Sequence, residues 1–127
     1  MGQRPRQVRQ DMYNQETPVR YHNTVTLVGH LKSDPILKDT KGGPLVKTTL
    51  VTKQYIKNCY GKEYVQAYHH TIVFDEDMAI AFSGQTKQGD MIQVEGYLRY
   101  WKPKDSQEVK CEIKCHYFHQ TGLTVDL

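Results

Sequence analysis

The stretch from Lys87 to Trp101, KQGDMIQVEGYLRYW, contains a β-strand with period-2 alternation. One face holds Ile92, Val94, Gly96 and Leu98, and the other holds Gln93, Glu95, Tyr97, Arg99 and Trp101. The first set suits a packed interior. The second set places aromatic rings and a cation on a face that should be wet, which is what a surface needs to stack unpaired bases and neutralise phosphates. An ordinary amphipathic strand would alternate in the same way, so the strand alone leaves both interpretations open.

The composition bounds the class of protein. The 127 residues suffice for about one domain with one modest core, and 38% of them are hydrophobic. A formal charge of +3 with a pI near 8.7 permits nucleic-acid binding without requiring it. Apolar runs are only a few residues long, which excludes a membrane-spanning helix, and no membrane partner is expected. Three cysteines without a framework spacing favour a reducing compartment.

Alternating patterns predict the remaining strands, which are expected at residues 24–31, 45–56, 64–74 and 108–119, with a short strand near 36–38. In 64–74 the odd positions are smaller and more typical of an interior, so the even positions are expected to face outward. The acidic residues 75–77 predict the start of one short helix, interrupted at 83–84. Three strands, a helix and two strands indicate a small barrel, and this is the layout of an OB-fold, a five-stranded Greek-key barrel.

The domain boundaries follow from the same patterns. Residues 1–22 are polar, rich in arginine and without hydrophobic periodicity, and we interpret them as a flexible basic arm. Residues 23–120 form the predicted all-β domain, with the helix between its third and fourth strands, and residues 121–127 form a C-terminal end.

Five blocks of the sequence carry a family resemblance. Residues 23–35 read N-x-V-x-L-V-G-x-L-x-x-D-P, 42–43 are Gly-Gly, 49–52 are TLVT, 68–74 are YHHTIVF and 89–99 are GDMIQVEGYLR. In order, and at nearly the same spacings, these blocks resemble segments of the bacterial and mitochondrial single-stranded DNA-binding proteins. The resemblance singles out the OB-fold and implies a homotetramer that binds single-stranded DNA in replication and repair, without sequence preference and without catalysis.

The resemblance also implies which aromatic residues stack bases. Tyr68 and Phe74 match two stacking positions of the family, six residues apart on the third long strand. Two family tryptophans are not kept in place, and the nearest rings in this sequence are Tyr55 and Trp101. Each stacked base contributes about 1–3 kcal/mol. The loss of one platform is therefore expected to weaken binding without abolishing it.

Histidine and basic residues complete the expected site. His70 falls where the family has arginine and is a candidate nucleic-acid contact, whereas His69 matches a family histidine near a subunit interface. The cations expected to neutralise phosphates are Lys47, Lys53, Arg99, Lys102 and Lys104.

Metal binding and catalysis are not expected. Cys111 and Cys115 lie near two histidines, but residues four apart on a strand are about 13 Å apart, too far to share a zinc ion. We therefore expect both cysteines to pack in the core as small hydrophobic residues. No phosphate loop or nucleophile–base motif is present, so neither a cofactor nor an enzymatic activity is predicted.

The C-terminus departs from the family, because residues 124–127 (TVDL) lack the acidic tip of the bacterial members. A removed tail, a mitochondrial-type member or a relative with another task would each explain this. Residues 23–29 and 69–72 also resemble OB-fold subunits of mitochondrial RNA-editing complexes. The leading hypothesis is a single-strand binder of the mitochondrial matrix, or alternatively of the bacterial cytoplasm. The alternative is an architectural subunit of a mitochondrial RNA–protein complex, whose outer face binds RNA or other subunits.

Overall fold

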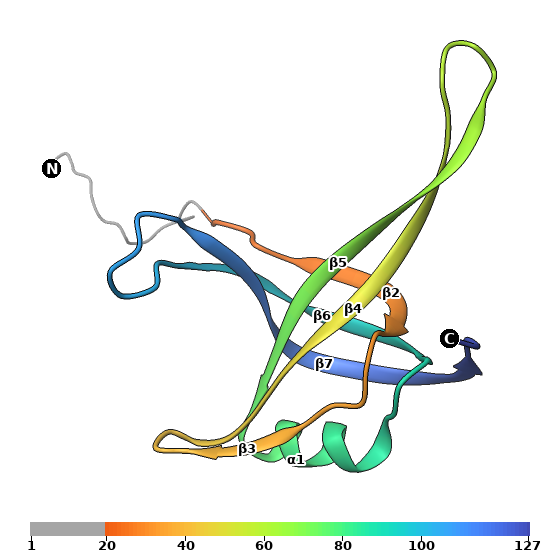
Figure 1. Ribbon diagram of the computed structural model, residues 1–127. Coiled ribbons are helices and arrows are strands. Elements are labelled where there is room, and N and C mark those ends of the chain that lie inside the picture. The colour runs from red at the N-terminus through yellow and green to blue at the C-terminus, as the bar shows by residue number, and fades with distance from the viewer. Residues whose placement is uncertain (1–19) are drawn as a thin grey trace, which may run out of the picture.

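The computed structural model describes residues 20–127, which form strands and one helix in the order that the sequence predicts (Figure 1). The elements are β2 (Val25–Leu31), β3 (Leu37–Thr40), β4 (Gly43–Lys57), β5 (Glu63–Asp75), α1 (Glu76–Gln85), β6 (Asp90–Trp101) and β7 (Lys110–Thr124). Most of the predicted basic arm, up to residue 19, lies outside the described residues. The last strand runs past the boundary expected at residue 120, and Thr124 still pairs with Asp90.

The strands pair in the order β2-β6-β7-β5-β4-β3, and β2 also pairs with β4. The neighbours are antiparallel except for β5 and β7, which run parallel. Because β2 pairs with both β6 and β4, the five long strands form a closed circuit of pairings, with α1 after the third of them. This arrangement confirms the expected OB-fold class.

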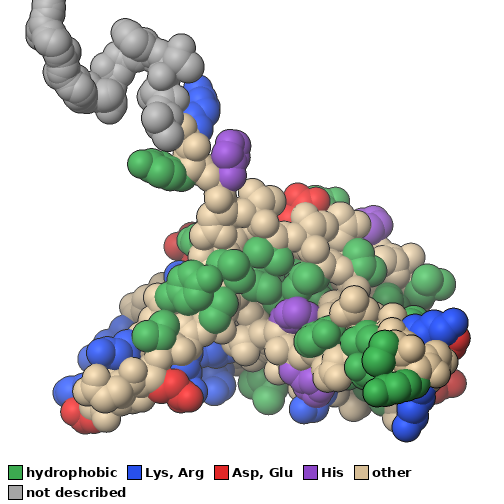
Figure 2. Space-filling model, turned by 90° about the horizontal axis from the view of Figure 1, so that it is seen from above, with side chains coloured by type: hydrophobic (Ala, Val, Ile, Leu, Met, Phe, Trp, Pro, Cys, Tyr) green, Lys and Arg blue, Asp and Glu red, His purple; other side chains and the backbone are tan. Residues whose placement is uncertain are grey.

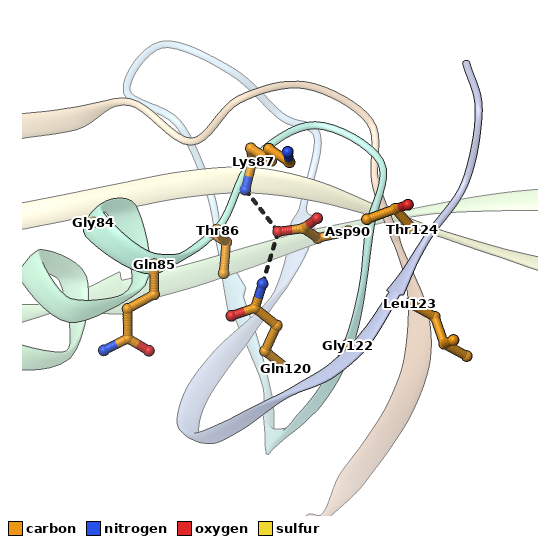
Figure 3. A pocket seen from close by; sticks show the side chains of 9 residues that line it. All are labelled: Gly84, Gln85, Thr86, Lys87, Asp90, Gln120, Gly122, Leu123 and Thr124. Carbon is orange, nitrogen blue, oxygen red and sulfur yellow. Dashed lines mark hydrogen bonds between the residues drawn. The ribbon is translucent and has the colours of Figure 1, made fainter.

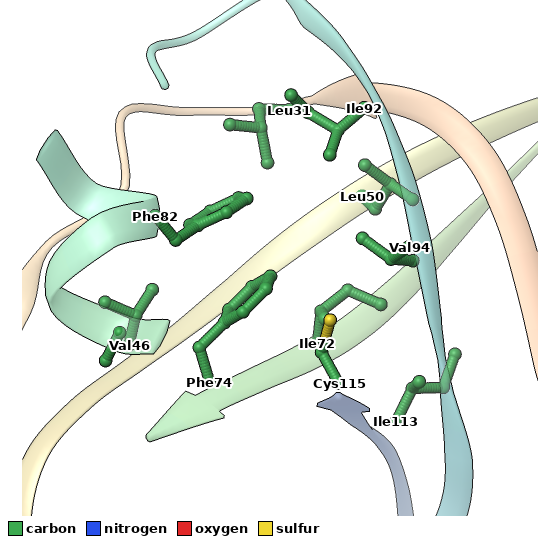
Figure 4. Close-up of a cluster of buried hydrophobic side chains, with 11 residues drawn as sticks. Leu31, Val46, Leu50, Ile72, Phe74, Phe82, Ile92, Val94, Ile113 and Cys115 are labelled. Carbon is green, nitrogen blue, oxygen red and sulfur yellow. The ribbon is translucent and has the colours of Figure 1, made fainter. Parts of the chain in front are cut away.

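The core lies between the sheet and α1 (Figure 4). The rings of Phe74 and Phe82 stack with their centroids 3.9 Å apart, and both meet the edge or face of Phe118 in T-shaped contacts. Phe82 and Ala79 are the buried residues of the helix. The core therefore holds α1 against the ends of β4 and β5.

The expectation that Phe74 faces outward is wrong, because its side chain is 0% exposed. Residues directly opposite each other in an antiparallel pair share a face of the sheet. Phe74 pairs with Val46 and Ile72 pairs with Thr48, all four of which are buried. The even positions of β5 therefore belong to the interior face, and α1 covers Phe74.

Strand β6 alternates as predicted. Ile92, Val94 and Gly96 are buried and Leu98 is half-buried, whereas Tyr97 and Trp101 are exposed. A Cβ atom at Gly96 would collide with the backbone oxygen of Lys114 on β7. The glycine is thus required by the close approach of two strands.

The alternation of residues 109–117 predicts one face with Val109, Cys111, Ile113, Cys115 and Tyr117, and its burial in the core is only partly confirmed. Ile113 and Cys115 are buried, but Cys111 and Tyr117 are exposed. Cys111 pairs with Tyr100 where the β6–β7 hairpin has left the core. The register shifts between Glu95 and Gly96, which places Tyr117 opposite Glu95 instead of on the inner face.

Helix α1 begins at Glu76 and continues without interruption to Gln85, so the break predicted at 83–84 does not occur. Asp75 makes no side-chain capping bond, and its carboxylate instead pairs with Lys114 Nζ at 2.9 Å. Within residues 20–127, no helix is long and apolar enough to cross a membrane.

Candidate nucleic-acid interface

Two long hairpins, β4–β5 and β6–β7, extend beyond the core and diverge from each other (Figure 1). Both carry exposed aromatic side chains: Tyr55, Tyr60, Tyr64 and Tyr68 on the first, and Tyr97, Tyr100, Trp101 and Tyr117 on the second. Figure 2 shows hydrophobic side chains gathered in a band between the tips, with Lys and Arg side chains at both ends. Exposed rings beside cations are suited to base stacking and phosphate contact.

Two of the predicted stacking residues, Tyr55 and Tyr68, lie on opposite faces of the β4–β5 hairpin. Tyr68 pairs with Thr52 and continues the face that is buried further along the strand. Tyr55 pairs with Val65 and lies three positions from Thr52, so it belongs to the opposite face, as does Lys53. Tyr55 is 85% exposed, whereas the Tyr68 hydroxyl donates to Gln54 Oε1 at 3.2 Å. The two rings therefore do not form one continuous stacking row on this hairpin.

His70 is half-buried on the same face as Tyr68, and its Nε2 lies 2.8 Å from Thr52 Oγ1. Burial, and to a smaller extent the neighbouring His69, lowers the pKa of His70 below 6.5. The ring is therefore mainly neutral at physiological pH. It can exchange hydrogen bonds with a nucleic acid, but it supplies little positive charge there.

The opposite face of the sheet brings together a second group of histidine and lysine residues. His30 on β2 and His69 on β5 both pair with Val51 on β4. His69 Nδ1 lies 3.5 Å from Lys32 Nζ. Burial, then Lys53 and then His69, lowers the pKa of the His30 imidazole. The role of His69 at a subunit interface stays a prediction.

Three predicted residues do meet, around a carboxylate that the sequence analysis did not single out. Lys47 Nζ lies 4.7 Å from the centroid of the Trp101 ring and 3.5 Å from Glu112 Oε1. Arg99 donates to Glu112 Oε2 through Nη2 at 2.6 Å and through Nε at 2.9 Å. We call Lys47, Arg99, Trp101 and Glu112 the Trp101 cluster. These residues come from β4, β6 and β7 and meet only in the folded sheet, where Arg99 lies directly opposite Glu112.

The remaining predicted cations lie at the tip of the β6–β7 hairpin. Lys102 and Lys104 are exposed in the loop between these strands. Tyr60, Tyr64 and Tyr100 are exposed aromatic residues of the two hairpins that the sequence analysis did not assign to the site. Their closeness to the turns at the hairpin tips is the sequence signal that could have revealed them.

A cavity of about 230 Å³ lies where the two hairpins separate. It opens between His70 on β5, Leu98 on β6 and Cys111 on β7. The parallel strands β5 and β7 pair at Ile72 with Ile113 and at Val73 with Lys114, and the hairpins then part. The hollow continues the face that carries Tyr68.

A second cavity, of about 440 Å³, lies between the end of α1 and the end of β7 (Figure 3). The buried Asp90 carboxylate accepts hydrogen bonds there from the Lys87 backbone and from Gln120 Nε2, both at 3.0 Å. These bonds fix the start of β6 to β7, and we interpret the carboxylate as structural. Across residues 20–127, no three His, Cys, Asp or Glu side chains are placed to hold a metal ion.

Known proteins resemble the chain in sequence and in fold. The family model described as "Single-strand binding protein family" matches residues 22–119. Single-stranded DNA-binding protein 1 of Chlorobaculum tepidum is 33% identical over 105 residues, which cover 79% of this chain and 65% of that protein.

Two solved structures show the fold. The wild-type single-stranded DNA binding protein from Thermus aquaticus matches with a TM-score of 0.70 and 21% identity, over 80% of this chain and 51% of that one. The Plasmodium falciparum SSB complex with ssDNA matches with a TM-score of 0.68 and 20% identity, over 87% of this chain and 100% of that one. The matched region thus spans less than two thirds of the Chlorobaculum protein and about half of the Thermus protein.

Proposed function

Because the chain belongs to the single-strand binding protein family, a family of binding proteins and not of enzymes, we propose that it binds single-stranded DNA through its two long hairpins. The observation that carries the proposal is the Trp101 cluster, in which an exposed indole lies beside a lysine and an arginine. An aromatic ring for a base next to cations for phosphates is the minimal unit of single-strand binding.

The two hairpin faces have different tasks in this proposal. Tyr64, Tyr68 and Tyr100 offer rings on the faces of the hairpins that continue the interior face of the sheet. Tyr55 and Trp101 offer rings on the outer faces. A DNA strand that contacts both sets of rings must pass around the edge of a hairpin. Every base has a π-face, so we expect binding without sequence preference. Phosphate contacts release counterions, so we expect binding to weaken as salt is added.

The test is quenching of Trp101, the only tryptophan, by oligo-dT and oligo-U at two salt concentrations. Strong, salt-sensitive quenching by oligo-dT supports the proposal. The double variant Tyr68→Ala, Trp101→Ala should bind oligo-dT with lower affinity. Because it lacks the tryptophan, its binding is measured with a fluorescent label on the oligonucleotide. A folded double variant that binds as tightly as the wild type would show that the rings are not the site. Clear preference for oligo-U would instead favour the RNA–protein complex subunit.

We further propose that the protein acts in replication or repair, in the mitochondrial matrix, as a homotetramer. The family membership supports the role and the tetramer. The compartment rests only on the resemblance of residues 23–29 and 69–72 to mitochondrial proteins, with the bacterial cytoplasm as the alternative. Sedimentation of the purified chain tests the tetramer, and a monomer that requires another OB-fold subunit would count against it. Fractionation of the source cells tests the compartment.

A further inference from the structure

We infer that Glu112 is a positioning residue of the proposed DNA-binding face. It anchors Arg99 and holds Lys47 over the Trp101 ring in the free protein. When DNA binds, Lys47 leaves Glu112 and contacts a phosphate of the DNA strand. The inference rests on the proposed function and adds a residue and an order of events to it. It is carried by the unequal contacts that Glu112 makes with its two cations.

The contact with Arg99 is the firmer one. Two nitrogens of the guanidinium donate to Glu112 Oε2, at 2.6 and 2.9 Å, from the directly opposite position on β6. The Glu112 side chain is only 7% exposed. A carboxylate buried to this degree is costly unless it is paired, and a charged bond with two donors is among the strongest available. Arg99 therefore remains the fixed partner of Glu112.

The contact with Lys47 is looser. Lys47 reaches Glu112 Oε1 at 3.5 Å from β4, across the intervening strand β5, and its side chain is 47% exposed. A lysine ammonium is a flexible point charge without the fork geometry of arginine. Lys47 can therefore leave Glu112 at low cost when a fully charged phosphate comes within reach.

Lys47 also lies over the ring of Trp101, 4.7 Å from its centroid. A base and an ammonium group cannot occupy the same ring face at once. Movement of Lys47 to a phosphate thus exposes the indole face on which the adjacent base can stack. The geometry couples one phosphate contact to one stacking contact, and Glu112 keeps both groups in place beforehand.

The experiment compares E112Q with E108Q, because both variants remove one negative charge near the β6–β7 hairpin. Glu108 is 74% exposed and contacts only Lys110, at 3.3 Å, among the ion pairs of residues 20–127. In the free protein, acrylamide should quench Trp101 more strongly in E112Q than in E108Q or the wild type, because Lys47 is no longer held over the ring.

The salt dependence of oligo-dT binding gives the second measurement. In E112Q, Arg99 loses its internal counterion and can neutralise one more phosphate. The slope of the logarithm of affinity against the logarithm of salt should then steepen by about 0.7. When the salt concentration is raised fourfold, the factor by which affinity falls should therefore be about 2.6 times larger for E112Q than for E108Q.

K47Q is the second variant, and its half-exposed position makes misfolding a small risk. It keeps the Arg99–Glu112 pair but removes the mobile cation. We expect stronger acrylamide quenching in the free protein and a slope shallower by about 0.7. Equal quenching and equal slopes for E112Q and E108Q, with normal DNA binding, would overturn the inference alone. Failure of the wild type to bind oligo-dT would overturn the proposed function as well.

Discussion

Substitution of Phe74 distinguishes a core residue from a base-stacking residue. The sequence pattern placed this ring on the DNA-binding face, whereas the structure buries it. The side chain is 0% exposed and contacts Phe82 and Phe118 at centroid distances of 3.9 and 5.9 Å. Truncation of a buried phenylalanine to alanine costs about 3–5 kcal/mol of unfolding free energy. Each aromatic pair contributes about 0.5–1.5 kcal/mol beyond the area it buries. Phe74→Leu should therefore lower the free energy of unfolding by at least this amount for each aromatic pair that it removes.

The assay is urea unfolding followed by circular dichroism, combined with oligo-dT binding at a temperature where the variant is folded. Phe74→Leu should lower the unfolding free energy and leave the affinity of the folded protein within a factor of two. Tyr68→Leu is the matched control on the same face of the same strand. It should lower affinity by about 1–3 kcal/mol, or about 5- to 150-fold, with stability nearly unchanged. A folded Phe74→Leu protein that lost tenfold or more in affinity would refute the reasoning.

Three further predictions concern the fold. Gly96→Ala should destabilise the protein by at least about 1–3 kcal/mol, measured by thermal unfolding, because the new methyl group meets the Lys114 backbone oxygen; a wild-type midpoint would show that the strands can separate. The lowered pKa values of His30 and His70 mean that the unfolded chain binds protons first as the pH falls. Stability is therefore complete above about pH 6.5, the unfolded value, and falls as the pH drops through the lower folded values. Urea unfolding at pH 7.5 and 5.5 should show this loss, and His30→Gln should reduce it; an unchanged pH dependence would exclude His30 as its source. Burial raises the pKa of the Cys115 thiol, so iodoacetamide should modify the two exposed thiols of the native protein and spare this one until the chain unfolds, as mass spectrometry can show.

The structure reduces the set of residues that are proposed to contact DNA. Phe74 leaves the set of stacking residues, and His70 contributes little charge at physiological pH. Lys47 and Arg99 are partly neutralised by Glu112 in the free protein. For the proposed function, we therefore expect the first phosphate contacts at exposed lysines such as Lys102 and Lys104, at the hairpin tip.

The sequence by itself determined the order of the strands and the one helix along the chain, and the interior face of the strand that contains Val94 and Gly96. Local alternation decides these features, because a strand with one buried face must repeat with period two. Each family block is a short contiguous segment of the chain, so the order of the blocks could be read without a structure. The exposed character of Trp101 followed from the same local pattern, whereas Tyr55 was singled out only by the family resemblance.

Only the tertiary structure decided which face of β5 is covered, because that depends on where α1 packs. Phe74 and Tyr68 share one face of one strand, yet the helix covers the first and the hairpin carries the second beyond the core. The position of Glu112 is decided in the same way. Its partners come from β4 and β6, and only the closed pairing of the strands brings the three side chains to one point.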